Sequence, residues 1–236
     1  MPKNLKPHEL RKRRVRVAMG TEKSRYATKP VLPERHLFVT EGTKTEPLYL
    51  QSMIERIAEK VGEGVKQQLV VHGGGDNTLS LLQRATDIMD SAGTSSDKSK
   101  DFQHVWVIYD RDSFPGDDFD NTASRCDALT KKFQRKGQNR TFHAIWSNEC
   151  FEVWLLFHFM LLSSGVPRSQ YADMLSKQLG TPYDKASPPN FDKLDWRKAV
   201  KNARKQMSNF PADAPPSKRN PCTNFYYLVE SFAAYI

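Results

Sequence analysis

Two aspartates one residue apart, Asp110 and Asp112, directly follow an apolar run at 105–109. In an extended chain, residues two apart point to the same side, so the two carboxylates should converge at one point of solvent. Carboxylates that close repel each other unless a cation lies between them, and Mg²⁺ prefers carboxylate and water oxygens. The pair therefore indicates a binding site for Mg²⁺, in which Mn²⁺ can take its place. The alternative interpretation of the two aspartates is a solvated turn.

A third candidate acid, Glu41, follows another apolar segment, at 36–40. Gly42 permits a tight turn immediately after that segment. If the segments ending at 40 and 109 are neighbouring strands, Glu41 lies beside Asp110 and Asp112 at the carboxyl edge of a sheet, where open α/β folds bind ligands. Three carboxylates around one or two divalent cations serve phosphoryl chemistry, because the cation neutralises the phosphate. The alternative for Glu41 is a solvated turn acid.

A fourth candidate, Glu152, lies between Phe151 and Trp154 in a segment suited to burial. A buried, unpaired carboxylate is costly, so Glu152 needs a metal or a cationic partner. If Asn148 caps the helix, Glu149 and Glu152 lie in its first turn and complement the helix dipole without any chemistry.

Basic residues provide the candidate phosphate contacts. Residues 1–35 hold 11 of the 36 Lys and Arg residues but 3 of the 27 Asp and Glu residues, so this segment has a net charge of +8 and the remainder +1. A basic N-terminal arm of this kind can bind the phosphate backbone of a nucleic acid. The alternative is a tail that only keeps the protein in solution. We single out the cluster of Arg11, Lys12, Arg13, Arg14 and Arg16. Lys44, near the predicted turn at Gly42, is a further candidate, and a plain surface lysine is its alternative.

The elements that position these residues are predicted from the apolar pattern. Strands are expected at 36–40, 68–71, 105–109 and 141–146, with helical segments between them. This alternation predicts an α/β fold with a four-stranded parallel sheet, and the strand order 2-1-3-4 would place Glu41 and Asp110 at the switch point. Thr45 and Asn148 are the expected N-caps of the helices that follow the first and fourth strands.

The C-terminal part has a different character. Helical patterns at about 168–179 and 192–208 alternate with proline-rich connectors, and a last helix is expected at about 222–235. We therefore predict a basic arm at 1–34, a catalytic domain at 35–165 and a helical appendage at 166–236 that packs on that domain.

Composition limits the class of protein. Among 236 residues there is no apolar run near 18 residues, which argues against a membrane span. The three cysteines form no C-x-x-C pair and the N-terminus lacks an apolar signal core, so a cytoplasmic protein without disulfides or zinc is expected. The glycine run at 73–75 lacks the ending of a nucleotide P-loop, and no dinucleotide fingerprint is present, so we predict no residues that bind an organic cofactor.

The acids and their spacing resemble the Toprim domain, the metal-binding catalytic module shared by topoisomerases, primases and several nucleases. More narrowly, the chain resembles the RloB-like family of prokaryotic defence proteins, which are relatives of an abortive-infection component. The resemblance covers residues 35–235 and is carried by the sequences at 40–47, 110–112, 147–159 and 220–223. Proline commonly follows Ser-Asn in that family; Glu149 stands there in this chain, which leaves open whether Glu149 or Glu152 is the functional acid. Serine usually follows Asn-Pro in the last block, where this chain has Cys222.

The resemblance implies roles for these residues. Glu41 would be a general acid/base or metal ligand, Asp110 and Asp112 would be Mg²⁺ ligands, and Glu152 would bind a second metal. It also implies a Mg²⁺-dependent endonuclease acting on DNA or RNA in antiphage defence, often with an ATPase partner. A non-catalytic nucleic-acid-binding or regulatory subunit is the alternative, and metal-dependent transfer on a nucleotide is a third. A homo-oligomer is neither indicated nor excluded.

Overall fold

The structure is a computed structural model that describes residues 33–74, 78–93, 101–111 and 116–236. All of the described residues belong to one compact unit, Leu32–Ile236. The boundary predicted between residues 165 and 166 stays a prediction.

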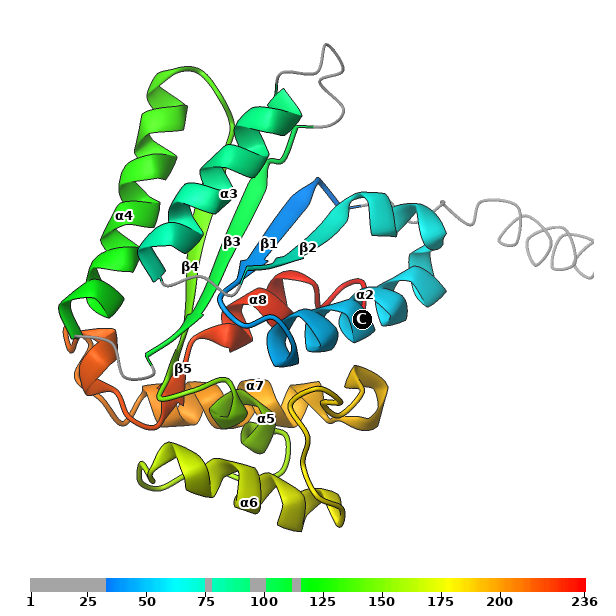
Figure 1. The fold of residues 1–236 in the computed structure, drawn as a ribbon, viewed down its shortest axis with the longest axis vertical. Coiled ribbons are helices and arrows are strands. Elements are labelled where there is room, and N and C mark those ends of the chain that lie inside the picture. The colour runs from blue at the N-terminus through cyan, green and yellow to red at the C-terminus, as the bar shows by residue number, and fades with distance from the viewer. Residues whose placement is uncertain (1–32, 75–77, 94–100, 112–115) are drawn as a thin grey trace, which may run out of the picture. The chain divides into compact units, whose positions relative to one another are not determined.

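A five-stranded sheet with the order β2-β1-β3-β4-β5 forms the centre of this unit (Figure 1). Its strands are β1 (His36–Thr40), β2 (Leu69–Gly73), β3 (His104–Asp110), β4 (Thr141–Asn148) and β5 (Cys222–Thr223). The first four strands are parallel, as predicted, and have the order 2-1-3-4 in which the first and third strands are neighbours, whereas β5 runs antiparallel to β4. The prediction of a four-stranded sheet was therefore wrong in its count. A two-residue strand is too short to show the alternation by which strands are predicted.

Seven α-helices and three 3₁₀ helices surround the sheet among the described residues. The α-helices are α2 (Thr45–Val61), α3 (Thr78–Gly93), α4 (Gly116–Arg135), α5 (Glu152–Phe157), α6 (Arg168–Leu179), α7 (Trp196–Met207) and α8 (Phe225–Ser231). The 3₁₀ helices are η1 (Glu63–Gln67), η3 (Phe191–Lys193) and η4 (Pro216–Lys218). None of the described helices is long and apolar enough to cross a membrane.

Two of the predicted helices are shorter than expected. The helix predicted at 192–208 is divided into η3 and α7, because the Asp195 side chain accepts a hydrogen bond from the Lys198 N–H and starts a new helix. The helix predicted at 222–235 is β5 followed by α8.

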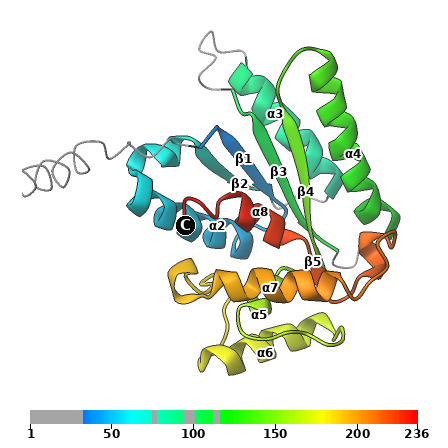
Figure 2. The ribbon, with the colours of Figure 1, turned by 180° about the vertical axis from the view of Figure 1, so that it is seen from behind.

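The two faces of the sheet carry separate hydrophobic layers. Phe38 and Trp106 point to the face covered by α2 and α8, whereas Val39 and Val107 point to the face covered by α3 and α4 (Figures 1 and 2). Because side chains alternate along a strand, Asp110 points to the same face as Trp106, toward α2. The strand period thus decides which helix can approach the candidate acid.

The C-terminal helices share a core with the sheet. Buried side chains of α5 to α8, including Trp154, Tyr171 and Phe225, belong to the same hydrophobic layer as Phe38 and α2. Figure 1 shows α5, α6 and α7 beyond the carboxyl ends of the strands, where the candidate acids lie. These helices therefore cover the edge of the sheet at which a ligand was expected.

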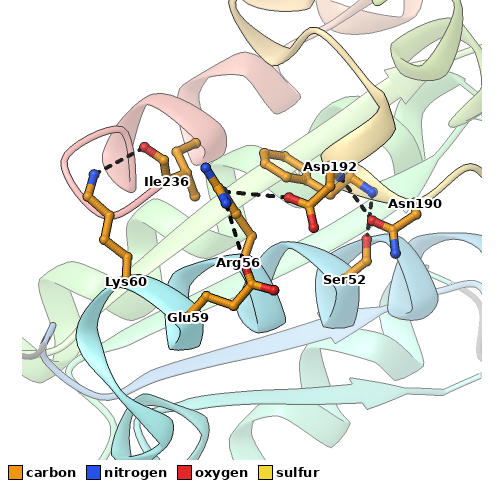
Figure 3. Close-up of polar contacts among 8 residues, drawn as sticks. Ser52, Arg56, Glu59, Lys60, Asn190, Asp192 and Ile236 are labelled. Carbon is orange, nitrogen blue, oxygen red and sulfur yellow. Dashed lines mark hydrogen bonds and ion pairs between the residues drawn. The ribbon is translucent and has the colours of Figure 1, made fainter.

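Polar contacts on the outer face of α2 hold the C-terminal part of the chain, namely the connector before α7 and the last residue (Figure 3). The Ser52 hydroxyl accepts a hydrogen bond from the Phe191 N–H, and the Arg56 guanidinium lies 3.6 Å from the Asp192 carboxylate. Lys60 donates to the carbonyl of Ile236 at the C-terminus. The connector that precedes α7 is thus fixed to the sheet domain through α2.

Candidate acidic site

Adjacent strands bring Glu41 and Asp110 together. Thr40 pairs with Ile108 across β1 and β3, and the Glu41 N–H continues the ladder by donating to the Ile108 carbonyl at 2.9 Å. The Glu41 carboxylate then accepts a hydrogen bond of 3.2 Å from the Asp110 N–H. The two acids lie side by side at the carboxyl edge, as the strand order predicted.

Asp110 is buried, with 6% of its surface exposed. Its Oδ2 accepts a hydrogen bond of 3.0 Å from the Phe151 N–H, whereas its Oδ1 is buried without a hydrogen-bond partner among the described residues. The expectation that this carboxylate faces solvent was therefore wrong. The segment that leads into α5 folds back over the end of β3, which a pattern of local residues does not reveal.

Glu46, in the first turn of α2, is a buried acid that the sequence interpretation missed. Its carboxylate occupies the space that a Cβ atom at position 42 would take, so any side chain there would overlap with it. Gly42 thus provides room for a neighbouring acid in addition to a turn. An acid in the first turn of a helix is common and normally exposed, so the sequence gives no signal for this burial.

Glu152 begins α5 and is 3% exposed. Its Oε1 lies 3.0 Å from the Lys185 ammonium and accepts a hydrogen bond of 3.3 Å from the Tyr183 hydroxyl. The prediction that Glu152 is buried and has a cationic or metal partner is confirmed, and the partner in this structure is Lys185. Lys185 and Tyr183 come from a connector between α6 and α7 in which sequence analysis singled out no residue.

Burial and, to a lesser extent, neighbouring carboxylates raise the pKa of Glu41, Glu46 and Asp110. Burial raises the pKa of Glu41 to about 7, a rise that Glu46 adds to and that the Asp110 N–H and the Arg168 guanidinium oppose. Burial, followed by the charges of Glu46, Glu152 and Glu41, raises the pKa of Asp110 well above its ordinary value. Burial also raises the pKa of Glu46, while its own backbone N–H, Lys185 and Arg168 act in the opposite direction. The surroundings of Glu41, Glu46 and Asp110 thus disfavour the ionised forms of these three carboxyl groups.

Both predicted N-caps were wrong. Lys44, which is exposed, occupies the N-cap position of α2 without a side-chain hydrogen bond. The Thr45 hydroxyl instead donates to the Lys185 carbonyl at 3.2 Å. Asn148 is the last residue of β4, and its amide donates to the carbonyls of Pro216 and Ser217. In both cases tertiary contacts with the C-terminal part replace the local contact that the sequence favoured.

Several predicted residues lie outside the described part of the chain, namely Asp112, Arg11, Lys12, Arg13, Arg14 and Arg16. Within the described ranges, no three His, Cys, Asp or Glu side chains form a group that holds a metal ion. His158 is a buried core histidine whose Nε2 lies 3.2 Å from the Tyr49 hydroxyl.

The donor chemistry nevertheless fits a hard divalent cation. The Asp110 Oδ1 is a buried oxygen that lacks a hydrogen-bond partner among the described residues, and the adjacent Glu41 carboxylate adds a second hard oxygen donor. Burial, followed by the charges of neighbouring carboxylates, raises the pKa of both acids, and a cation at these oxygens would stabilise their ionised forms. Glu41 and Asp110 are therefore the residues of this site that would hold a metal.

The fold and the site together define a class of protein. It is an α/β protein with a mostly parallel sheet and with buried carboxylates at the carboxyl edge of the central strands. The sequence model of the family described as RloB-like protein matches residues 36–232. The chain therefore belongs to the RloB-like family. No curated protein and no solved structure matches it.

Proposed function

We propose that this protein is a divalent-cation-dependent endonuclease of the Toprim type, which cleaves phosphodiester bonds of DNA or RNA. The observation that carries the proposal is the contact between Glu41 and Asp110 at the edge where β1 and β3 end, together with the unpaired Asp110 Oδ1. Mg²⁺ at these carboxylates would supply Lewis acidity toward a phosphodiester, with Mn²⁺ as a substitute. Asp112 completes the proposed ligand set, and Glu152 is proposed for a second metal.

The side chains around the acids suit this chemistry. If Glu41 serves as the general acid/base and not as a metal ligand, its pKa of about 7 in the metal-free site suits the transfer of a proton at neutral pH. The charges of Arg168 and Lys185 act on Glu46, which limits the repulsion that a negatively charged phosphate would meet at the acids. The resemblance to prokaryotic defence proteins supports antiphage defence as the context, and an ATPase partner as a companion. We further propose that the protein acts in the cytoplasm.

The test is cleavage by the full-length protein. Plasmid DNA and a structured RNA are incubated with Mg²⁺, with Mn²⁺ or with EDTA. We expect cutting only with a metal, and a loss of roughly 100-fold or more in Glu41→Gln and Asp110→Asn. Glu59→Gln, at an exposed position on α2, is the matched control and should cut normally. Undiminished cutting by both site variants excludes the assignment.

The second candidate is a non-catalytic nucleic-acid-binding or regulatory subunit. The observation that favours it is the Lys185–Glu152 ion pair, which already neutralises one of the buried acids without a metal. Under this alternative the acids are structural. Its mark is salt-sensitive binding of nucleic acid with no cutting under any divalent metal.

A further inference from the structure

Helix α7 carries a one-sided distribution of charge. Its 12 residues include five basic ones and no acidic one, namely Arg197, Lys198, Lys201, Arg204 and Lys205. With 3.6 residues per turn, these five side chains fall within an arc of about 120° around the helix axis and extend over about 12 Å along it. All five are exposed, whereas Ala199, Val200, Ala203 and Gln206 on the opposite side are buried. The helix thus presents a single basic face, which we call the α7 basic face.

This arrangement works against the stability of the helix itself. Residues three and four apart are neighbours on a helix, and like charges at these spacings destabilise it. All four such neighbours of Lys201 are basic: Arg197, Lys198, Arg204 and Lys205. A face selected only for solubility would intersperse both signs of charge.

Helix α2 of the same protein has exposed charges of both signs. The Arg56 guanidinium lies 3.2 Å from the carboxylate of Glu59, one turn further along the helix (Figure 3). Lys66, just beyond α2, lies 2.6 Å from the Glu55 carboxylate. The contrast is sharper because the chain outside residues 1–35 is almost neutral, with a net charge of +1.

Few contacts neutralise the α7 basic face. Arg204 makes a bidentate ion pair with Glu230 of α8, and the Arg197 guanidinium lies 4.3 Å above the Trp196 ring. Lys198, Lys201 and Lys205 form no ion pair with any residue that the structure describes. In Figure 2, α7 lies in front of α5 and is not covered by another element. Three lysine ammonium groups are therefore available to an anionic partner.

Helix α7 is also firmly attached to the element that carries part of the acidic site. The Asn202 amide donates a hydrogen bond of 2.8 Å to the Phe157 carbonyl at the end of α5, and Glu152 begins the same helix. A polymer held by the α7 basic face would thus be bound by an element fixed to the site. We propose that this face binds the sugar–phosphate backbone of a nucleic acid without reading its sequence, since a row of lysines matches a row of phosphates.

This inference deepens the proposed function by naming a binding surface for the substrate, but its test does not depend on cutting. The full-length protein and its variants are titrated with fluorescent 30-mer DNA and RNA in EDTA at several salt concentrations. We compare Lys198→Gln/Lys201→Gln/Lys205→Gln with a charge-matched control from exposed residues of α4, Lys131→Gln/Lys132→Gln/Arg135→Gln. The predicted basic arm at residues 1–34 is present in every variant.

We expect the α7 triple variant to bind at least about tenfold more weakly at 0.1 M salt, with a salt slope lower by roughly 2, and the control to stay within about twofold of the wild type. Lys201→Gln alone should lower the slope by about 1 if the triple variant does not fold. An equal loss in both triple variants, no loss in the α7 variant, or binding to anionic lipid vesicles rather than nucleic acid would overturn the proposal. Absence of cutting in the presence of this binding pattern would reject the nuclease assignment and leave the surface in place.

Discussion

The backbone N–H of Asp110 donates a hydrogen bond to the Glu41 carboxylate, although the two residues are 69 positions apart in the chain. The contact exists because β1 and β3 are adjacent, parallel and in a register that ends both strands at the same edge. Two acids are thereby held at one point, and the chain leaves the Asp110 Oδ1 buried without a hydrogen-bond partner among the described residues.

Asp110→Asn should stabilise the metal-free protein while it abolishes cutting. Burial and the neighbouring carboxylates raise the pKa of Asp110, so its ionised form destabilises the fold. Asparagine retains an oxygen for the Phe151 N–H but carries no charge. We expect a gain of about 1–2 kcal/mol in urea unfolding at pH 8 in EDTA.

The sign of this effect fixes its pH dependence. A raised folded-state pKa means that the penalty exists at high pH and disappears as pH falls and Asp110 becomes protonated, so the gain from Asp110→Asn should shrink on acidification. Asp173→Asn, at an exposed position of α6, is the control and should change stability little. A variant that is less stable than the wild type at pH 8 would contradict the account of the buried charge.

Lys185→Met should destabilise the protein by about 1–2 kcal/mol, because it leaves Glu152 buried without its cation. The loss is moderated because the Lys185 side chain is 49% exposed and partly screened by solvent. Adding Glu152→Gln should recover much of the loss, and urea unfolding of the four proteins in this double-mutant cycle measures the coupling. Lys193→Met, also exposed, should be close to neutral. Additive effects of the two site substitutions would show that the ion pair contributes nothing.

Gly42→Ala should destabilise the protein by about 1–3 kcal/mol, because its methyl group would overlap with the Glu46 carboxylate. The cause is steric rather than conformational. The same substitution in a Glu46→Ala background should therefore be nearly neutral in thermal unfolding. An equal cost in both backgrounds would assign the role of Gly42 to the turn alone.

His143→Phe should reduce the loss of stability at acidic pH. The His143 ring stacks on Trp106 with 4.0 Å between ring centroids, and burial, followed by the charge of His104, lowers its pKa to about 4. A lowered folded-state pKa means that the unfolded chain takes up a proton first, so this histidine withdraws stability as pH falls from about 6.5 toward 4.

Phenylalanine keeps the stack on Trp106 and cannot be protonated. Between pH 7.5 and pH 4.5, the free energy of unfolding of the variant should fall by about 1–2 kcal/mol less than that of the wild type. This difference is smaller than the pKa shift alone would give, because the ring is only partly buried. Urea unfolding at the two pH values gives the difference directly. Parallel pH dependences in the two proteins would contradict this interpretation.

Local periodicity was sufficient where an element is long and its burial is regular. The first strand was predicted with the bounds His36–Thr40 that it has, and the alternation of strands with helices predicted that four strands are parallel. The order 2-1-3-4 was a condition of the sequence argument, and the structure has that order. That order alone places Glu41 beside Asp110. Strand β5 was not predicted, because it has two residues and a period of two cannot be recognised in so short a segment.

The predictions of the helix caps and of the buried acids were wrong or incomplete for a different reason. Thr45 and Asn148 have the chemistry of N-caps, but each bonds instead to a carbonyl far away in the sequence, Thr45 to Lys185 and Asn148 to Pro216 and Ser217. Local preference is weaker than the need to satisfy buried polar groups, and that need depends on which segments meet. Glu46 was missed for the same reason.

The sequence by itself determined the alternation of strands and helices, the acids that follow the first and third strands, and the concentration of positive charge at residues 1–35. These properties depend on residue type and on neighbours along the chain. Only the tertiary structure decided that the carboxyl edge is covered, that Lys185 is the partner of Glu152, and that Glu46 joins the acids. Burial and charge pairing depend on contacts between segments that are distant in the chain, from 41 positions for Asp110 with Phe151 to 140 for Thr45 with Lys185, and no local pattern encodes them.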